Sequence, residues 1–292
     1  MNNQDPSISI QTHRASLQST GDGSTTLFSE PFQQPYHNRG GAASESGYLF
    51  LEMTGLTNAA SQEDAGEATT LNILEIGFGT GLNMALLYDK LHHDKLLNGK
   101  LHDSRQRDPV SCHFYSVEGF PPNPSLLENM EYGVSADSTR IAGIIQHTLH
   151  YAKPGWNDVV IEPSFHLHLL ISRFEEFASK DTLSEKIPPI NLIFHDPFSP
   201  ETNPSGWTPE LFRRLRKLAA EDALLSTYSA SSRARAAMAT AGWYVARAPG
   251  ALNKREMTLA SPNPDRLKSF KRVNESRLAE RLRNGDFSET SK

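Results

Sequence analysis

Residues 71–83 read LNILEIGFGTGLN, and this stretch decides the fold that we expect for the chain. Its apolar first half predicts a buried strand over residues 71–76. Glycine at positions 77, 79 and 81 then predicts a tight turn into a helix that begins near Leu82. Only a residue without a Cβ lets the backbone turn sharply and also approach a ligand closely. We therefore expect a nucleotide-type cofactor to bind where this strand ends.

Glu75 and the spacing of the glycines narrow the choice of cofactor. Glu75 lies inside the apolar run, where an unpaired carboxylate would be costly to bury. The glycines follow a G-x-G-x-G pattern, and Leu82 stands where a dinucleotide fingerprint has its third glycine. An acidic residue before G-x-G-x-G resembles the first motif of the S-adenosylmethionine-dependent methyltransferases, in which the loop backbone faces the methionine part of the cofactor. A nicotinamide oxidoreductase does not fit this spacing.

The composition sets the class of protein and the compartment. A length of 292 residues allows one large domain or two small ones. No apolar run approaches the ~18 residues of a membrane span, and the N-terminus lacks the basic start and apolar core of a secretory signal. Cys112 is the single cysteine, which excludes a disulfide framework and a thiolate metal cluster. We expect a cytoplasmic protein with no metal and no membrane association.

The charges are segregated along the chain. The formal net charge is -5, but residues 205–292 hold 17 Lys and Arg against 9 Asp and Glu, a balance of +8. The rest of the chain is correspondingly acidic. Such a basic segment is either a surface for phosphates or a set of ordinary solvated helix faces.

Further strands bring candidate residues to the same edge of the predicted sheet. Residues 111–117 predict a strand that ends at Glu118, where a carboxylate would accept hydrogen bonds from both ribose hydroxyls. An insertion over residues 98–109 accounts for the long spacing from the glycines. In the next expected strand, residues 164–171, His166 and His168 share one face and are interpreted as structural. No residue is assigned to adenine, because the segment Ser172, Arg173, Phe174 lacks an acidic side chain.

A fourth apolar strand, residues 189–194, leads into the loop HDPFSPETNPSGW, which places His195 and Asp196 at the ligand-binding edge. A helix is expected from Trp207, with Thr208 as its cap. Its basic face would consist of Arg213, Arg214, Arg216 and Lys217. A fifth strand is expected at residues 223–228 and a helix at 229–241. An antiparallel strand pair is expected at 242–248 and 255–260.

These elements predict an α/β, Rossmann-like class I methyltransferase fold with helices on both faces. Its sheet would be mostly parallel and seven-stranded, with an antiparallel closing strand. We expect a flexible segment or a loosely paired strand over residues 1–26 and the methyltransferase domain with an N-terminal extension over 27–260. A charged tail is expected over 261–292, with a helix at 264–282 that either covers the domain or remains mobile.

Four stretches together resemble one family: YHNRGG...ESGYLFLE, LEIGFGTGLN, HDPFSPETNPSGWT and GALNKREMTLA. From about residue 27 to residue 260 the chain resembles the methyltransferase part of the MnmC-type tRNA 5-methylaminomethyl-2-thiouridine biosynthesis proteins. The resemblance implies methyl transfer from S-adenosyl-L-methionine to the aminomethyl nitrogen at position 5 of the wobble uridine in the tRNA anticodon stem-loop. Many members carry a fused flavin-dependent oxidase. This chain has no room for one and no second glycine fingerprint, so a separate oxidase or upstream tRNA-modifying enzyme would supply the acceptor.

The resemblance also implies residue roles. Glu118 would hold the ribose, and Asp196 would face the substrate amine. His195 and Pro197 depart from the family pattern, so His195 receives no role. The cofactor would be lined by Glu75, Gly77, Phe78, Gly79, Thr80, Gly81 and Asn83.

An alkylamine near pH 7 is mostly ammonium, so we expect Asp196 to orient the amine and to accept its proton. Tyr36, Phe198 and Tyr228 are candidates to wall the site or to stack on the base. The expected contacts with the tRNA backbone come from Arg233, Lys254 and Arg255. Two alternatives remain open: a methyltransferase acting on a small molecule or a protein, and a non-catalytic RNA-binding or partner-binding module on the same fold.

Overall fold

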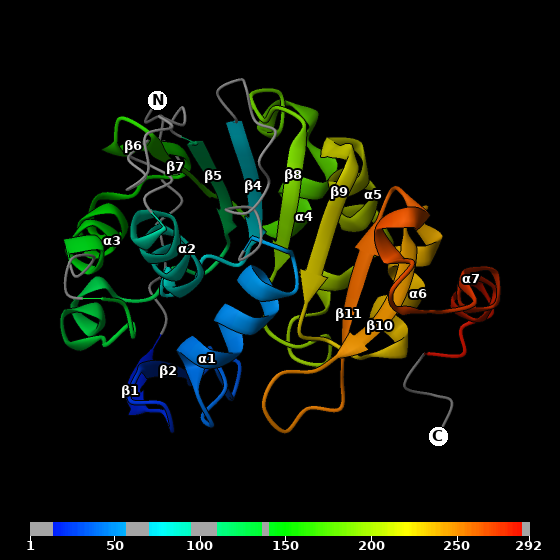
Figure 1. Ribbon diagram of the computed structural model, residues 1–292, viewed down its shortest axis with the longest axis horizontal. Helices are drawn as coiled ribbons and strands as arrows, with labels where there is room; N and C mark the ends of the chain where they lie inside the picture. Colours follow the sequence, from blue (N-terminus) through cyan, green and yellow to red (C-terminus); the bar gives the residue numbers. More distant parts are fainter. Residues whose placement is uncertain (1–13, 57–69, 95–109, 136–139, 288–292) are drawn as a thin grey trace, which may run out of the picture.

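The computed structural model describes residues 14–56, 70–94, 110–135 and 140–287. Within these residues one large sheet forms the centre of the molecule (Figure 1). In chain order its strands are β4 (Thr70–Ile76), β5 (Ser111–Glu118), β6 (Gly155–Glu162), β7 (Phe165–Ile171), β8 (Ile190–His195), β9 (Ala219–Thr227), β10 (Tyr244–Pro249), β11 (Glu256–Ser261) and β12 (Lys271–Arg272). They lie in the order β12-β10-β11-β9-β8-β4-β5-β7-β6.

The middle of this sheet is parallel. β9, β8, β4, β5 and β7 run in the same direction, and β11 pairs antiparallel with both β9 and β10. Because parallel strands end at the same edge, the carboxyl ends of β4, β5, β8 and β9 lie together. The glycine turn, Glu118 and Asp196 all follow at this edge.

Helices cover both faces of the sheet (Figure 1). One face packs on α1 (Ala42–Ser46), its continuation as a π-helix η1 (Gly47–Glu52), α2 (Leu82–His93) and α3 (Arg140–Tyr151). The opposite face packs on α4 (Phe174–Ser179), α5 (Pro209–Leu218) and α6 (Ser232–Thr240). β4 follows this division, because Ile73 belongs to the first core while Leu74 and Ile76 belong to the second.

An N-terminal extension lies beside the ligand-binding edge. It contains a three-stranded antiparallel sheet of β1 (Ala15–Ser19), β2 (Thr25–Ser29) and β3 (Gln34–Pro35). The main-chain N–H of Thr25 donates to the carbonyl of Glu131, which fixes β2 against the segment that follows β5. β1 and the start of β2 fall within residues 1–26, and their antiparallel pairing agrees with the paired strand rather than the flexible segment expected there. Residues 1–13 lie outside the described residues.

The architecture was predicted, but several details were wrong. The sheet described here has nine strands instead of seven, because β6 pairs with β7 and the short β12 pairs with β10. The helix expected at 264–282 is three elements: a 3-10 turn η7 (Pro264–Leu267), β12 and α7 (Glu275–Arg283). The side chain of Asn274 accepts from the N–H of Arg277 and so starts α7 separately. The described part of this segment, up to residue 287, thus packs on the domain, which is one of the two outcomes expected for it.

The segment after β5 contains the 3-10 turn η3 (Pro124–Asn129). One other expectation, concerning α5, needs correction. Thr208 caps α5 as predicted, accepting from the N–H of Leu211. Arg214 does not belong to a basic surface, because it is buried and its guanidinium bonds Asp181, Ser184 and the carbonyl of Ala178. The insertion expected at 98–109 lies outside the described residues.

Candidate active site

The glycine turn after β4 is packed directly against the loop after β8. Gly77 has a φ of +94°, and a Cβ on it would lie 2.8 Å from the carbonyl oxygen of Asp196. The N–H of Asp196 donates to the carbonyl of Ile76 over 2.9 Å. Only glycine satisfies both the dihedral angle and the space at this position. The turn therefore brings Asp196 to the edge where a cofactor would bind.

Glu75 is fully buried beneath the turn and has two side-chain partners. Its Oε1 accepts from Nδ2 of Asn83 over 2.9 Å, and its Oε2 accepts from Oγ of Ser116 over 2.7 Å. Burial raises the pKa of Glu75 to about 8, against the effect of both hydrogen bonds. These partners explain how the sequence tolerates a carboxylate in an apolar strand.

Asn83 also reaches Asp196. The same Nδ2 donates to Oδ2 of Asp196 over 2.9 Å, so one amide bridges two carboxylates. Burial raises the pKa of Asp196 to about 7; the charge of Glu45 adds to the shift, while Asn83 and Lys254 oppose it. Asp196 is thus a stronger base than an exposed aspartate and is held in a fixed orientation.

Glu118 closes the glycine turn from the neighbouring strand. Its Oε2 accepts from the N–H of Gly79 over 2.7 Å, and its Oε1 accepts from the N–H of Phe120. Burial raises the pKa of Glu118, and these main-chain N–H groups oppose the shift. Each carboxylate oxygen has a further lone pair, so the expected bonds to ribose hydroxyls stay compatible with this arrangement.

Two cavities meet at Asp196. The smaller, of about 30 Å³, lies against Gly77, Gly79 and Glu118. The larger, of about 460 Å³, extends toward β3 and α1 and includes Glu45 and Lys254. Both cavities share one wall, formed by Tyr36, Asp196, Pro197 and Phe198. This arrangement suits two ligands that meet at a carboxylate.

Aromatic side chains form much of the shared wall. Phe198 stacks on Phe32 at 4.3 Å between ring centroids and meets Tyr36 edge-on at 4.9 Å. Phe32 also contacts Phe120 edge-on at 5.1 Å, and the guanidinium of Arg173 lies 3.8 Å from the Phe120 centroid. The smaller cavity is too narrow for a nucleoside, so binding requires these rings to shift.

The buried polar atoms around the turn fit S-adenosyl-L-methionine. The phenol oxygen of Tyr36, Oγ1 of Thr80 and Oδ1 of Asn83 are buried and have no hydrogen-bond partner within the described part of the chain. Such groups are costly unless a ligand or water satisfies them. Tyr36 lines both cavities, whereas Thr80 and Asn83 lie behind the glycine turn and are not among the described lining residues. The Tyr36 hydroxyl can therefore meet a hydroxyl, ammonium or carboxylate group of a ligand directly.

The other predicted substrate residues lie at different places. Tyr228 donates its hydroxyl to the carbonyl of Pro197 over 2.8 Å and walls the larger cavity. Lys254 lines this cavity and a third, more open one of about 580 Å³, which Arg255 also lines. Arg233 is exposed in the first turn of α6 and is not among the described residues lining any of the three cavities.

The sequence did not single out Glu45, Phe32 or Phe120. Glu45 is buried on α1 and lines the larger cavity. It stands within ESGYLFLE, and the only feature of the sequence that could have indicated it is a single carboxylate just before an apolar helix. Phe32 stands among the aromatics of LFSEPFQQPY, whose packing partners the sequence alone does not identify.

His195 lies inside the protein and is not among the described residues lining the cavities. His195 is buried between Trp207 and Phe212, and burial lowers its pKa to about 3. Among the described residues, no cluster of three or more His, Cys, Asp or Glu is arranged to hold a metal ion. No described helix has the length and apolar character needed to cross a membrane.

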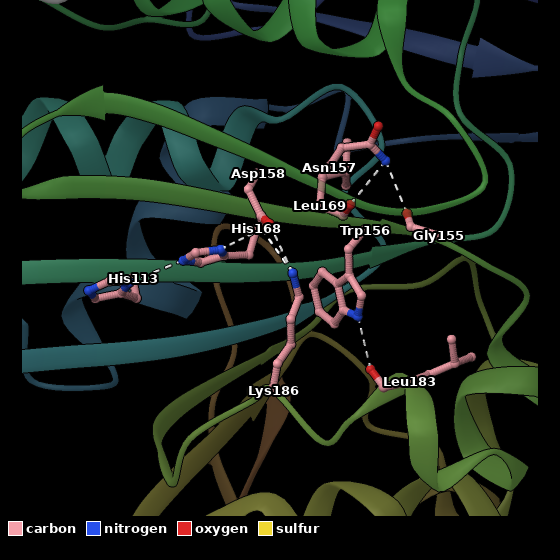
Figure 2. A network of polar contacts seen from close by, with 9 residues as sticks. All are labelled: His113, Gly155, Trp156, Asn157, Asp158, His168, Leu169, Leu183 and Lys186. Atoms are coloured by element: carbon pink, nitrogen blue, oxygen red, sulfur yellow. Dashed lines mark hydrogen bonds and ion pairs between the residues drawn. The ribbon is translucent and has the colours of Figure 1, made fainter.

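A second polar network joins β5, β6 and β7 (Figure 2). Nδ1 of His113 lies 3.1 Å from Nε2 of His168, and Nδ1 of His168 lies 2.7 Å from Oδ1 of Asp158. Nζ of Lys186 lies 2.9 Å from Oδ2 of Asp158 and 4.7 Å from the Trp156 ring centroid. This network holds the sheet edge together and agrees with the structural interpretation of His168.

Comparison with known proteins supports the methyltransferase reading. Residues 143–263 match the model of a family described as S-adenosyl-L-methionine-dependent methyltransferase. The bifunctional protein MnmC of tRNA 5-methylaminomethyl-2-thiouridine biosynthesis from Aromatoleum aromaticum is 30% identical over 83% of this chain, and that from Pseudomonas fluorescens is 29% identical over 78%. The chain spans about a third of these relatives, 34% and 32% of their lengths.

A solved structure agrees with the fold. The crystal structure of MNMC2 from Aquifex aeolicus has a TM-score of 0.64 at 22% identity, over 93% of this chain and 76% of that one. The resemblance to the MnmC-type methyltransferase part, the Rossmann-like methyltransferase fold and the cofactor S-adenosyl-L-methionine are thereby confirmed.

Proposed function

We propose that this chain, which is similar to MnmC-type proteins over about four fifths of its length, methylates the 5-aminomethyl group of the wobble uridine in tRNA. The product would be 5-methylaminomethyl-2-thiouridine. One observation carries the proposal: Asp196 lies on the wall between a cavity beside the glycine turn and a larger cavity open to an acceptor. The names of the relatives supply the identity of the acceptor.

The proposed cofactor site comprises the turn from Gly77 to Gly81 with Phe78 and Thr80, together with Glu75, Asn83 and Glu118. When bound, S-adenosyl-L-methionine supplies a methyl group activated by the adjacent sulfonium. Glu118 holds the ribose hydroxyls, while Oδ1 of Asn83, which has no partner among the described residues, accepts a hydrogen bond from the polar end of the ligand. Glu75 acts through Asn83, which it fixes in place.

Asp196 prepares the acceptor. An alkylammonium has no lone pair until it loses a proton, and Asp196 accepts this proton from the amine, directly or through water. Its raised pKa of about 7 brings the carboxylate nearer to the amine in basicity. Asn83 keeps the carboxylate oriented, and Tyr36, Phe198 and Tyr228 confine the acceptor beside it. Alignment of the amine with the methyl group supplies much of the remaining rate enhancement.

The proposed partner is the anticodon stem-loop of tRNA. Arg233, Lys254 and Arg255 are exposed, and they belong to the segment with a charge balance of +8. Exposed cations of this kind bind phosphates without base specificity. We place the protein in the cytoplasm, downstream of an oxidase or another tRNA-modifying enzyme that leaves a free aminomethyl group.

Mass analysis of nucleosides tests the proposal. Transfer RNA that lacks the final methyl group is incubated with the protein and S-adenosyl-L-methionine, then digested. We expect the aminomethyl nucleoside to be replaced by the methylaminomethyl nucleoside. Unchanged nucleosides, with S-adenosyl-L-methionine still bound by the protein, would contradict the proposed acceptor and favour a different substrate.

A further inference from the structure

Glu45 and Lys254 form an ion pair on the wall of the larger cavity. Oε1 of Glu45 lies 2.8 Å from Nζ of Lys254 and accepts from Nδ2 of Asn38 over 3.1 Å. The Glu45 side chain is 8% exposed, whereas that of Lys254 is 41% exposed. The carboxylate is therefore fixed in the protein, and its cationic partner lies at the surface.

Lys254 has a second place to interact. Its ammonium lies 4.9 Å from the ring centroid of Tyr228, and the residue also lines the third, more open cavity. A cation over an aromatic face is stabilised by the ring electrons. Lys254 can therefore leave Glu45 without losing every favourable contact.

The larger cavity is thus lined by two carboxylates, the buried Glu45 and the partly buried Asp196, and Lys254 pairs with the first of them. The Asp196 carboxylate instead accepts a hydrogen bond from the neutral amide of Asn83. Two anions that share a poorly solvated space attract a cationic ligand and repel an anionic one, because neither is screened by bulk water.

We propose that Glu45 is a specificity-determining residue: it binds the ammonium of the acceptor in place of Lys254 and rejects acceptors that carry a carboxylate on the amine. This inference rests on the proposed function, since it concerns the same acceptor cavity. Glu45 captures the acceptor as a cation, and Asp196, at the wall shared with the smaller cavity, then takes the proton. Lys254 neutralises Glu45 while the cavity holds no acceptor.

Matched amines test this role without requiring methyl transfer. Calorimetry at pH 8 on protein saturated with S-adenosylhomocysteine compares benzylamine with N-benzylglycine, which adds a carboxylate to the same amine. The wild type is expected to bind benzylamine at least tenfold more tightly. Glu45→Gln keeps the size and the acceptor for Asn38, and it should reduce the preference to about threefold or less.

Two further variants sharpen the result. Lys254→Met removes the competing cation and should strengthen benzylamine binding several-fold, the opposite direction from Glu45→Gln. Glu52→Gln, seven residues after Glu45 and exposed at the end of η1, is the matched control and should retain the wild-type preference. An unchanged preference in Glu45→Gln, or a wild type that binds neither probe or both equally, overturns the inference.

The outcome is separable from the proposed function. If the wild type prefers benzylamine but transfers no methyl group to tRNA, the role of Glu45 in binding a cation is supported and the proposed acceptor is contradicted. If the wild type methylates tRNA but Glu45→Gln still discriminates between the two probes, only the proposed role of Glu45 is contradicted.

Discussion

The amide of Asn83 donates to the carboxylate of Asp196 over 2.9 Å, although 113 positions separate the two residues. Asn83 stands in the first turn of α2, and Asp196 follows β8. The same amide also binds Glu75. A single side chain thus joins the glycine turn, which would hold the methyl donor, to the carboxylate proposed to act on the acceptor.

Asp196→Asn should lower kcat by about 10² to 10⁴, the usual contribution of a general base. The amide has the same shape and can still accept from Asn83 through its oxygen. We therefore expect the affinity for S-adenosyl-L-methionine, measured by calorimetry, to change little. Methyl transfer at the wild-type rate would contradict the role of Asp196.

The wild-type rate should rise as the pH passes through about 7, because Asp196 must be ionised to accept a proton. Initial rates between pH 5.5 and 8.5 at saturating substrates measure this profile. A rate that is flat across this range would show that ionisation of Asp196 does not limit the reaction.

Glu75 should make the ligand-free protein less stable as the pH rises. Its folded-state pKa of about 8 lies above the ordinary value of 4.5, so the folded state binds a proton that the unfolded state releases. This contribution to stability is complete below about pH 4.5 and is lost by about pH 8. Asp196 acts in the same direction between its ordinary value of 3.8 and about 7.

Glu75→Gln isolates the part due to Glu75, since glutamine keeps the size and both hydrogen-bonding positions. Thermal unfolding from pH 5 to pH 8 should show a smaller decline in Tm for the variant than for the wild type. Parallel curves for the two proteins would mean that Glu75 is ionised in the folded protein at every pH tested.

Gly77→Ala should destabilise the protein by about 2 kcal/mol or more, because a positive φ costs about 1–2 kcal/mol and the Cβ would meet the Asp196 carbonyl at 2.8 Å. It should also displace Asp196 and so reduce activity. Gly143→Ala is the control: Gly143 lies within α3 with open space around its Cβ position, and the change should stabilise by about 0.5–1 kcal/mol. Urea unfolding measures both free energies.

Tyr36→Phe should leave the free energy of unfolding unchanged or slightly higher, because the hydroxyl is buried without a partner among the described residues. Binding of the cofactor or the acceptor should weaken by about 2- to 10-fold, the worth of one hydrogen bond. Calorimetry with S-adenosyl-L-methionine and the KM for tRNA identify which ligand the hydroxyl serves.

Tyr48→Phe supplies the contrast. Tyr48 bonds the carbonyl of Pro249 over 3.2 Å and is not among the described lining residues of the cavities. The Tyr48→Phe substitution should lower stability only slightly and should leave the binding of both ligands unchanged. If Tyr36→Phe lowered stability without altering either binding constant, its hydroxyl would have a purely structural role.

Binding of tRNA should weaken steeply with salt, by about tenfold or more between 50 and 200 mM, if three or more cations contact phosphates. Arg233→Ala should reduce the slope of log K against log salt by about one. Arg277→Ala, on α7 and outside the proposed surface, should leave the slope unchanged. An affinity independent of salt would contradict the basic surface.

Local sequence determined much of the fold and part of the site. The apolar run with three glycines predicted β4, its turn and α2, because strand burial and positive φ are properties of neighbouring residues. Glu118 and Asp196 were placed at one edge because parallel strands end together. The additional strands β6 and β12 were missed, because β6 mixes polar and apolar residues, β12 has only two residues, and both pair with neighbours already in the sheet.

The tertiary structure alone decided which residues meet at the site. Nothing near Asn83 in the chain indicates that it bridges Glu75 and Asp196, and nothing near Lys254 indicates that it pairs with Glu45. These contacts join segments that are distant in sequence, and the packing of α1 and α2 on the sheet sets their distances. The sequence determined how a methyl donor would be held, whereas the fold decided that the buried Glu45 and the partly buried Asp196 line one cavity, because burial and charge pairing depend on the whole packed chain.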